Sequence, residues 1–143
     1  MSDMDNFARY TLAMSNLLML KPLRYAHYQD DKLSALVILF TAIASYAMHI
    51  SETKHSIDPG PFITPWSYIL LNVDRVMALI SAAYFAQKWI MLGYPSYPAR
   101  LMVAGAICSF LGEKTMNVPL YTLLHLIWHY TAYASMAEVL SVF

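Results

Sequence analysis

The segment Leu33–Ile50 contains no Asp, Glu, Lys or Arg. A mostly apolar helix of about 17–25 residues is long enough to cross the hydrocarbon core of a bilayer. The composition agrees with this surrounding, because 59% of the 143 residues are hydrophobic and 13% are charged. Ordinary soluble domains have roughly 45–50% apolar and 25% charged residues. We therefore expect an integral membrane protein that crosses its membrane several times.

Other apolar segments follow the same pattern. Spanning helices are predicted at Leu33–Ile50, Trp66–Met91, Ala99–Leu111 and Pro119–Phe143. Pro119 suits a first helical turn, where no backbone N–H is needed. The leading segment Phe7–Leu20 is interrupted by polar residues, so it either spans obliquely or lies at the membrane interface. Residues 1–143 are expected to form one domain, an all-α polytopic transmembrane bundle of four to five helices.

Polar stretches separate the expected helices. A hinge containing Lys21, Arg24, Asp30, Asp31 and Lys32 follows the leading segment, and a loop rich in Pro and polar residues occupies 51–65. If every segment crosses, the face that holds the C-terminus has slightly more Lys and Arg, which favours a cytosolic C-terminus. The formal net charge is zero and no basic run occurs, which argues against a nucleic-acid partner.

Two pairs of polar residues, each spaced four apart, occur inside the predicted spans. His125 and His129 share one face of the last helix, and Ser45 and His49 share one face of the second segment. Ionisable groups at a helix centre cost about 2.5–3.5 kcal/mol each on membrane-insertion scales. These side chains are therefore expected to meet partners inside the bundle.

Asp74 adds a carboxylate near the start of the third segment, and Ser67 and Ser81 lie seven residues to either side of it. This spacing indicates a polar seam that faces other helices instead of lipid. If every segment crosses, the end of the second segment and the starts of the third and last segments share one membrane face. We therefore expect one depth in the membrane for Ser45, His49, Asp74, His125 and His129.

Three neutral imidazoles with an open fourth position are typical of a catalytic zinc site, whereas structural zinc sites usually contain cysteine thiolates. The pattern predicts that His49, His125 and His129 bind Zn²⁺. Asp74 could accept a proton from a water molecule or orient an imidazole. Ser45 could donate a hydrogen bond to that water or to a developing oxyanion.

Each piece also has a purely structural interpretation. An intramembrane Ser or His commonly hydrogen-bonds a neighbouring helix, and Asp74 beside Arg75 could form an interfacial ion pair. Ser51 and His55 also have the four-residue spacing, so they are an alternative to the earlier Ser–His pair.

The order Ser-x3-His at the end of one span, Asp in the next and His-x3-His in the last resembles the CREST superfamily of membrane hydrolases. That superfamily includes the alkaline ceramidases, the progesterone and adiponectin receptors and the myomaker-like proteins. The resemblance implies that the three histidines hold zinc and that Asp74 and Ser45 serve the bound water. It implies a reduced form of a seven-helix core, and the long gap between His49 and Asp74 favours the myomaker-like branch.

The activity implied by the resemblance is zinc-dependent hydrolysis, within the membrane, of a ceramide-like lipid amide or a lipid ester. The lipid substrate would enter from the bilayer. An alternative is a non-catalytic membrane protein, lipid-binding, receptor-like or fusion-related, that keeps the polar cluster for packing. A di-iron or haem enzyme is a third class, disfavoured because the chain has only five histidines. With so few helices, a homo-oligomer could be needed to close the open side of the site.

Overall fold

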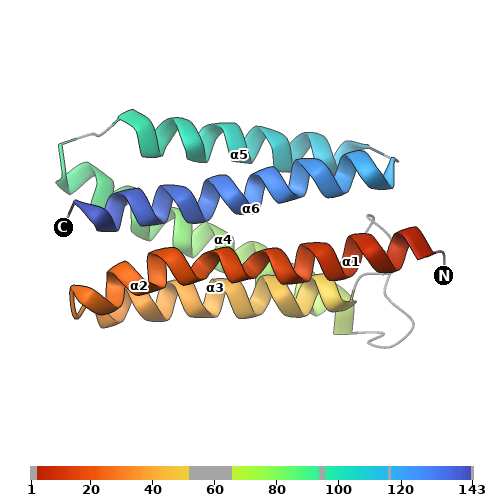
Figure 1. Cartoon of the computed structure of the whole chain (residues 1–143), viewed down its shortest axis with the longest axis horizontal. Helices are drawn as coiled ribbons and strands as arrows, with labels where there is room; N and C mark the ends of the chain where they lie inside the picture. The colour runs from red at the N-terminus through yellow and green to blue at the C-terminus, as the bar shows by residue number, and fades with distance from the viewer. Residues whose placement is uncertain (1–2, 52–65, 94–95, 116, 143) are drawn as a thin grey trace.

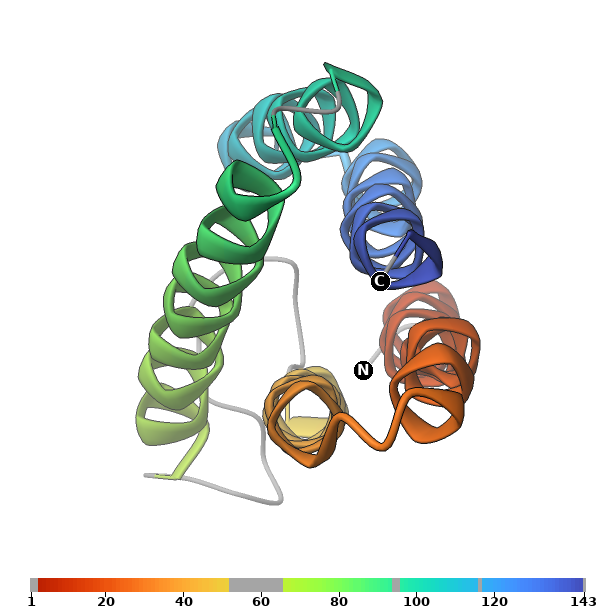
Figure 2. The same cartoon turned by 90° about the vertical axis from the view of Figure 1, so that its left-hand side faces the viewer.

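The computed structural model describes residues 3–51, 66–93, 96–115 and 117–142. All regular structure in these ranges is helical, as predicted: α1 Asp3–Ser15, the 3₁₀ segment η1 Asn16–Met19, α2 Leu20–Tyr28, α3 Lys32–Ser51, α4 Trp66–Met91, α5 Ser96–Lys114 and α6 Val118–Ser141. α1, α2, α3, α5 and α6 run roughly along one common axis (Figure 1), and α4 crosses it obliquely (Figure 2). Seen from one end, α3, α4, α5 and α6 follow an arc that α1 and α2 complete (Figure 2).

Two of these helices are long and apolar enough to cross a membrane, namely α3 and residues Tyr68–Met91 of α4. The end of α3 and the starts of α4 and α6 lie at the same end of the bundle (Figure 1). This is the arrangement predicted for helices that cross in alternating directions. α5 is longer than the predicted Ala99–Leu111, since it begins at Ser96 and ends at Lys114.

The leading helical segment is longer than predicted. α1, η1 and α2 follow one another end to end and form one rod from Asp3 to Tyr28 (Figure 1). The predicted start of the hinge at Lys21 is wrong, because Lys21 and Arg24 lie within α2. Pro22 stands in the first turn of α2, where backbone N–H groups have no intrahelical partner, and the preceding turn tightens to a 3₁₀ helix. The rod contacts both α3 and α6 and is therefore part of the bundle.

The chain reverses between α2 and α3 through a short polar turn. Asp30 adopts a φ of 51°, a left-handed conformation that Asp tolerates. Asp31 then caps α3, because its carboxylate accepts hydrogen bonds from the Ser34 backbone N–H at 3.0 Å and the Ser34 hydroxyl at 2.6 Å. Lys88 Nζ of α4 donates to the same carboxylate at 2.7 Å. This contact ties the turn to the far end of α4.

Asp31 is an acid whose ionised form the fold stabilises. Burial by itself would raise the pKa of Asp31, but hydrogen bonds from Lys88 and Ser34 outweigh it and hold the pKa below its usual value. A folded-state pKa below the unfolded-state pKa stabilises the protein above the unfolded-state value. That stabilisation is lost as the pH falls through the folded-state pKa.

We therefore expect Asp31→Asn to lower the thermal midpoint of the purified protein at pH 7 by about 3 °C or more. Below about pH 4 the thermal midpoint of the wild-type protein should fall, and that of the variant should fall less, because the variant has no carboxylate to protonate at this position. Thermal unfolding followed by circular dichroism at several pH values measures both effects. Asp30→Asn is a matched control, because the Asp30 side chain is 87% exposed and lies 3.9 Å from Lys32 Nζ. Equal shifts in the two variants would contradict a specific role for Asp31.

The apolar core lies between α2, α3 and α6, with Phe85 added from α4. Ile38 of α3 and Leu140 of α6 are fully buried there, next to the small side chains of Ala26 and Ala42. The small side chain of Ala26 lets α2 come close to both α3 and α6. The core therefore holds the rod against the two helices that carry the histidines.

α5 packs along α6 at a position where only glycine fits. A Cβ atom at Gly105 would lie 2.1 Å from Thr131 Oγ1 and 2.9 Å from Trp128 Cε3. Thr131 cannot turn away easily, because its side chain is β-branched and its hydroxyl donates to the carbonyl of Ile127 at 2.8 Å. The missing side chain of Gly105 therefore sets the distance between α5 and α6.

Gly105→Ala should destabilise the protein by about 1–3 kcal/mol, the usual cost of overpacking a tight contact. Adding Thr131→Ala should restore part of the loss. Gly112→Ala is the control on the same helix, because its Cβ would meet Leu124 Cβ at an ordinary 3.5 Å. Thermal or denaturant unfolding in detergent measures these differences, and a neutral Gly105→Ala variant would show that α5 and α6 can separate freely.

Candidate metal centre

Three histidine rings meet in the interior of the bundle. His49 comes from the last turns of α3, and His125 and His129 come from successive turns of α6. Their exposed fractions are 0%, 6% and 4%, respectively. The ring centroids lie 4.8 Å apart for His49 and His125, 5.2 Å for His49 and His129, and 5.1 Å for His125 and His129. The predicted convergence of these three residues is confirmed.

Helical spacing explains why both α6 histidines face inward. Tyr121, His125, His129 and Tyr133 recur every four residues on α6, and all four are buried. Residues four apart lie on one face of a helix, one turn above the other. Each ring in this row contacts the next, with centroids 5.2 Å apart for the first pair and 6.4 Å for the last. The row forms the inner face of α6.

His129 has a hydroxyl partner at each ring nitrogen. Ser45 Oγ of α3 lies 3.2 Å from its Nε2, and Ser15 Oγ of α1 lies 2.5 Å from its Nδ1. His129 is therefore held between the leading rod and α3. The predicted Ser45–His49 pair contributes to the centre from two positions on one face of α3, since both side chains are buried.

The three histidines lie close enough to bind one metal ion. One candidate ligand nitrogen from each ring can be chosen so that all three lie within 4.8 Å of one another. Zinc–nitrogen bonds of about 2.0–2.1 Å require somewhat closer ligands, so the rings would move inward on binding. Nδ1 of His125 is buried and has no hydrogen-bond partner among the described residues. A buried ring nitrogen without a hydrogen-bond partner fits a metal ligand.

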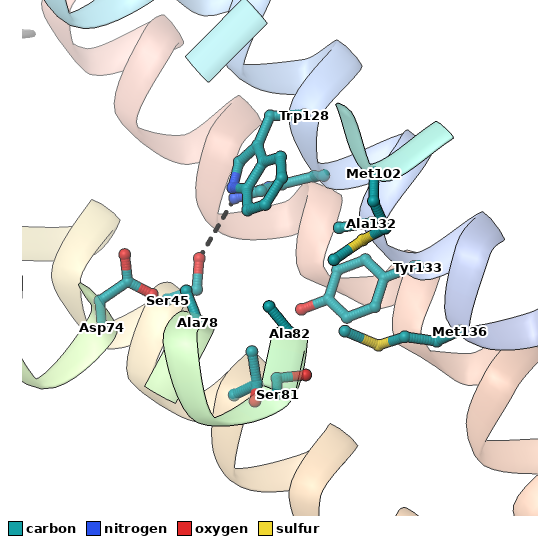
Figure 3. A pocket seen from close by; sticks show the side chains of 12 residues that line it. Ser45, Asp74, Ala78, Ser81, Ala82, Met102, Trp128, Ala132, Tyr133 and Met136 are labelled. Atoms are coloured by element: carbon teal, nitrogen blue, oxygen red, sulfur yellow. Dashed lines mark hydrogen bonds between the residues drawn. The ribbon is translucent and has the colours of Figure 1, made fainter. Parts of the chain in front are cut away.

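A small cavity borders the centre. Ser45, His129 and Tyr133 line it from α3 and α6, and Asp74 and Ser81 line it from α4 (Figure 3). The dashed line that starts at Ser45 in Figure 3 marks the hydrogen bond between Ser45 and His129. The cavity volume is about 40 Å³. A few waters or one small functional group can occupy it.

The predicted seam on α4 is present where side chains are described. Ser81 is 1% exposed and Asp74 is half-buried, and both line the cavity. The side chain of Ser67 lies outside the described residues. Arg75, which follows Asp74, forms an ion pair with Glu113 of α5 at 3.6 Å.

Of the alternative pair Ser51 and His55, the structure describes Ser51. The Ser51 hydroxyl is buried and donates to the carbonyl of Met48 in its own helix at 2.6 Å. His55 lies outside the described residues.

Two site residues were not predicted from the sequence. Ser15 contacts His129, and Asn16 accepts a hydrogen bond from the Tyr133 hydroxyl at 2.7 Å. Both come from the leading rod, and each reaches one residue of the row on α6. The signal was present as two adjacent polar residues, Ser15 and Asn16, between the apolar runs on either side of them.

The chain matches no family model, no curated protein and no solved structure. The chemistry of the centre is therefore inferred from its own donor set: three buried imidazoles, with a serine hydroxyl and a carboxylate at the adjoining cavity.

Purified protein is expected to bind one divalent metal ion per chain. His49→Ala or His125→Ala should weaken binding by more than about 100-fold, because losing a ligand costs more than losing a residue that only orients one. His27→Ala is the matched control, because His27 is exposed on α2. Metal analysis and competition with a chromophoric chelator measure the affinity. Unchanged binding in the first two variants would contradict the centre.

Proposed function

We propose that this chain is a polytopic integral membrane protein and a short member of the CREST superfamily. We infer that it acts as a zinc-dependent hydrolase on a ceramide-like lipid amide or on a lipid ester. The observation that carries the proposal is the meeting of three buried histidines beside a cavity that also holds Ser45 and Asp74. These residues follow the chain order on which the resemblance rests.

The outer surface supports a location within a bilayer. On α4, Leu79 and Met91 are 71% and 72% exposed. Only 11% of the most apolar stretch of this helix is buried. A core helix of a soluble protein would be mostly buried. Large apolar side chains are also exposed on the other helices, for example Phe7, Phe40, Phe110 and Leu123. Exposing apolar surface to water costs about 25 cal/mol per Å², whereas acyl chains solvate it without that cost.

The residues around the cavity suit hydrolysis of a carbonyl compound. A zinc ion held by the three histidines would polarise the carbonyl and make a water molecule a better nucleophile. Asp74 is the carboxylate at the cavity that can take up the proton lost by that water and return it to the leaving amine or alcohol. The Ser45 hydroxyl is a donor at the same cavity for the negative charge that develops on the carbonyl oxygen.

The size and lining of the cavity favour a lipid substrate. Apart from the polar groups, its walls include Met102, Trp128 and Met136. A cavity of about 40 Å³ holds a reacting carbonyl group and water. We expect the acyl chains of the substrate to lie along the apolar outer faces of the helices. A substrate that reaches the cavity sideways from the bilayer could place its carbonyl group inside and its acyl chains outside.

A second candidate is a non-catalytic membrane protein that uses the cluster for packing. It is favoured by the hydrogen bonds at both nitrogens of His129 and by the edge-to-face contacts among the three rings. Such contacts stabilise helix association in a membrane without any chemistry.

Asp74→Asn separates the two candidates. As a hydrolase the variant should keep the wild-type thermal midpoint and metal content but lose activity by about 100–10,000-fold, the usual contribution of a general base. Release of fatty acid from a fluorescent ceramide or lipid ester in nanodiscs measures the activity. Glu113→Gln is the control, because Glu113 forms an exposed ion pair with Arg75 away from the cavity lining. A wild-type protein without hydrolase activity, together with a destabilised Asp74→Asn variant, would favour the packing role.

A further inference from the structure

The hydroxyl of Ser15 has two close neighbours: a carbonyl oxygen, which can only accept a hydrogen bond, and a histidine ring nitrogen, which can donate or accept one. Ser15 Oγ lies 2.6 Å from the carbonyl oxygen of Leu12 and 2.5 Å from Nδ1 of His129. A carbonyl oxygen can only accept, so the serine hydrogen must point to Leu12. Otherwise two oxygen lone pairs would face each other at 2.6 Å. Ser15 Oγ must then accept a hydrogen bond from His129, and the Nδ1 of His129 must carry a hydrogen.

This assignment fixes the other nitrogen. A neutral imidazole has one N–H, so Nε2 of His129 has a lone pair. The Ser45 hydroxyl, 3.2 Å away, then donates to that lone pair. We propose that Ser15 is a positioning residue: it holds His129 in the tautomer whose Nε2 lone pair faces Ser45 and the metal centre.

The function of this arrangement rests on the proposed zinc chemistry. Histidine ligands commonly donate their second ring N–H to an oxygen, which fixes the ring and strengthens the ligand. Ser15 occupies that place for His129 from the leading rod. If His129 held a metal ion through Nε2, the Ser45 hydroxyl would lose this acceptor and could donate to the substrate instead. One hydrogen bond from α1 thus prepares both the ligand and the oxyanion donor.

The local structure of the rod fits this role. Ser15 is the last residue of α1 and Asn16 is the first of η1, so the helix type changes where the rod meets α6. The Asn16 side chain is buried; it accepts from the Tyr133 hydroxyl and donates to the carbonyls of Leu12 and Ala13. The two neighbours therefore contact His129 and Tyr133, which lie one turn apart on α6. Two adjacent hydrogen bonds fix the register of the rod against the histidine helix.

The tautomer can be measured without any metal. In metal-free protein labelled with ¹⁵N-histidine and reconstituted in nanodiscs, the resonances of His129 should report a hydrogen on Nδ1 and none on Nε2. The resonances are assigned by their loss in His129→Gln. A wild-type His129 that carries its hydrogen on Nε2, or on both nitrogens, would overturn the proposal. This reading needs no further variant, so it stands even if a serine substitution fails to fold.

Variants of Ser15 test whether this residue fixes the tautomer of His129. Ser15→Ala should shift His129 toward the Nε2–H tautomer and weaken zinc affinity by about 10–100-fold. Ser15→Thr, which keeps the hydroxyl, should restore both. Ser135→Ala is the matched control, because it removes another buried interhelical bond, the one from Ser135 to the Pro98 carbonyl at 3.1 Å. An unchanged tautomer in Ser15→Ala would refute the proposal.

The two levels of inference fail in different ways. If the wild-type protein binds no zinc but shows the expected tautomer, the proposed hydrolase function is wrong and the positioning role of Ser15 stands. If zinc binds and the tautomer does not depend on Ser15, the metal centre stands and the positioning role is wrong.

Discussion

Hydrogen bonds between buried polar side chains fix how these helices face one another. α3, α4 and α6 are apolar over much of their surface, so an apolar face alone does not determine which side of each helix faces the others. A buried polar group without a partner costs about 1–3 kcal/mol. His129, bonded to Ser15 and Ser45, therefore holds the leading rod, α3 and α6 together near the middle of the rod and of α6. Asp31, bonded to Lys88, holds the turn before α3 against α4 at one end of the bundle.

The class of fold and most helix ends could be predicted from local signals. Long apolar segments predict helices, and the polar loop before α4 and Asn117 with Pro119 before α6 mark where helices begin. The end of the leading rod could not be predicted this way. Lys21 and Arg24 resemble a hinge in sequence, yet long basic side chains can extend toward polar surroundings from a continuous helix. Charge alone therefore does not mark a break near a helix end.

The metal centre was predictable because two independent regularities agree on it. Four-residue spacing places His125 and His129 on one face of α6, and the alternation of crossings brings His49 to the same end. Ser15 follows from neither rule. Its contact with His129 joins residues 114 positions apart, and it depends on the depth and rotation of a rod whose path the sequence left open. A partner of that kind becomes visible only when the helices are packed.

The placement of Asp74 separates two parts of the proposed chemistry. The histidines and their serine partners come from α1, α3 and α6. α1 packs against both α3 and α6, and the side chains of α3 and α6 meet at Ser45, His49 and His129. The carboxylate comes from α4, which is held by Lys88 on Asp31 at one end, by Phe85 in the core and by Arg75 on Glu113 near Asp74. Metal binding then depends on the first group of helices, whereas proton transfer depends on where α4 lies against them. Under the proposed function, a change that loosens α4 should impair hydrolysis but leave metal binding intact, which a single rigid packing cluster would not allow.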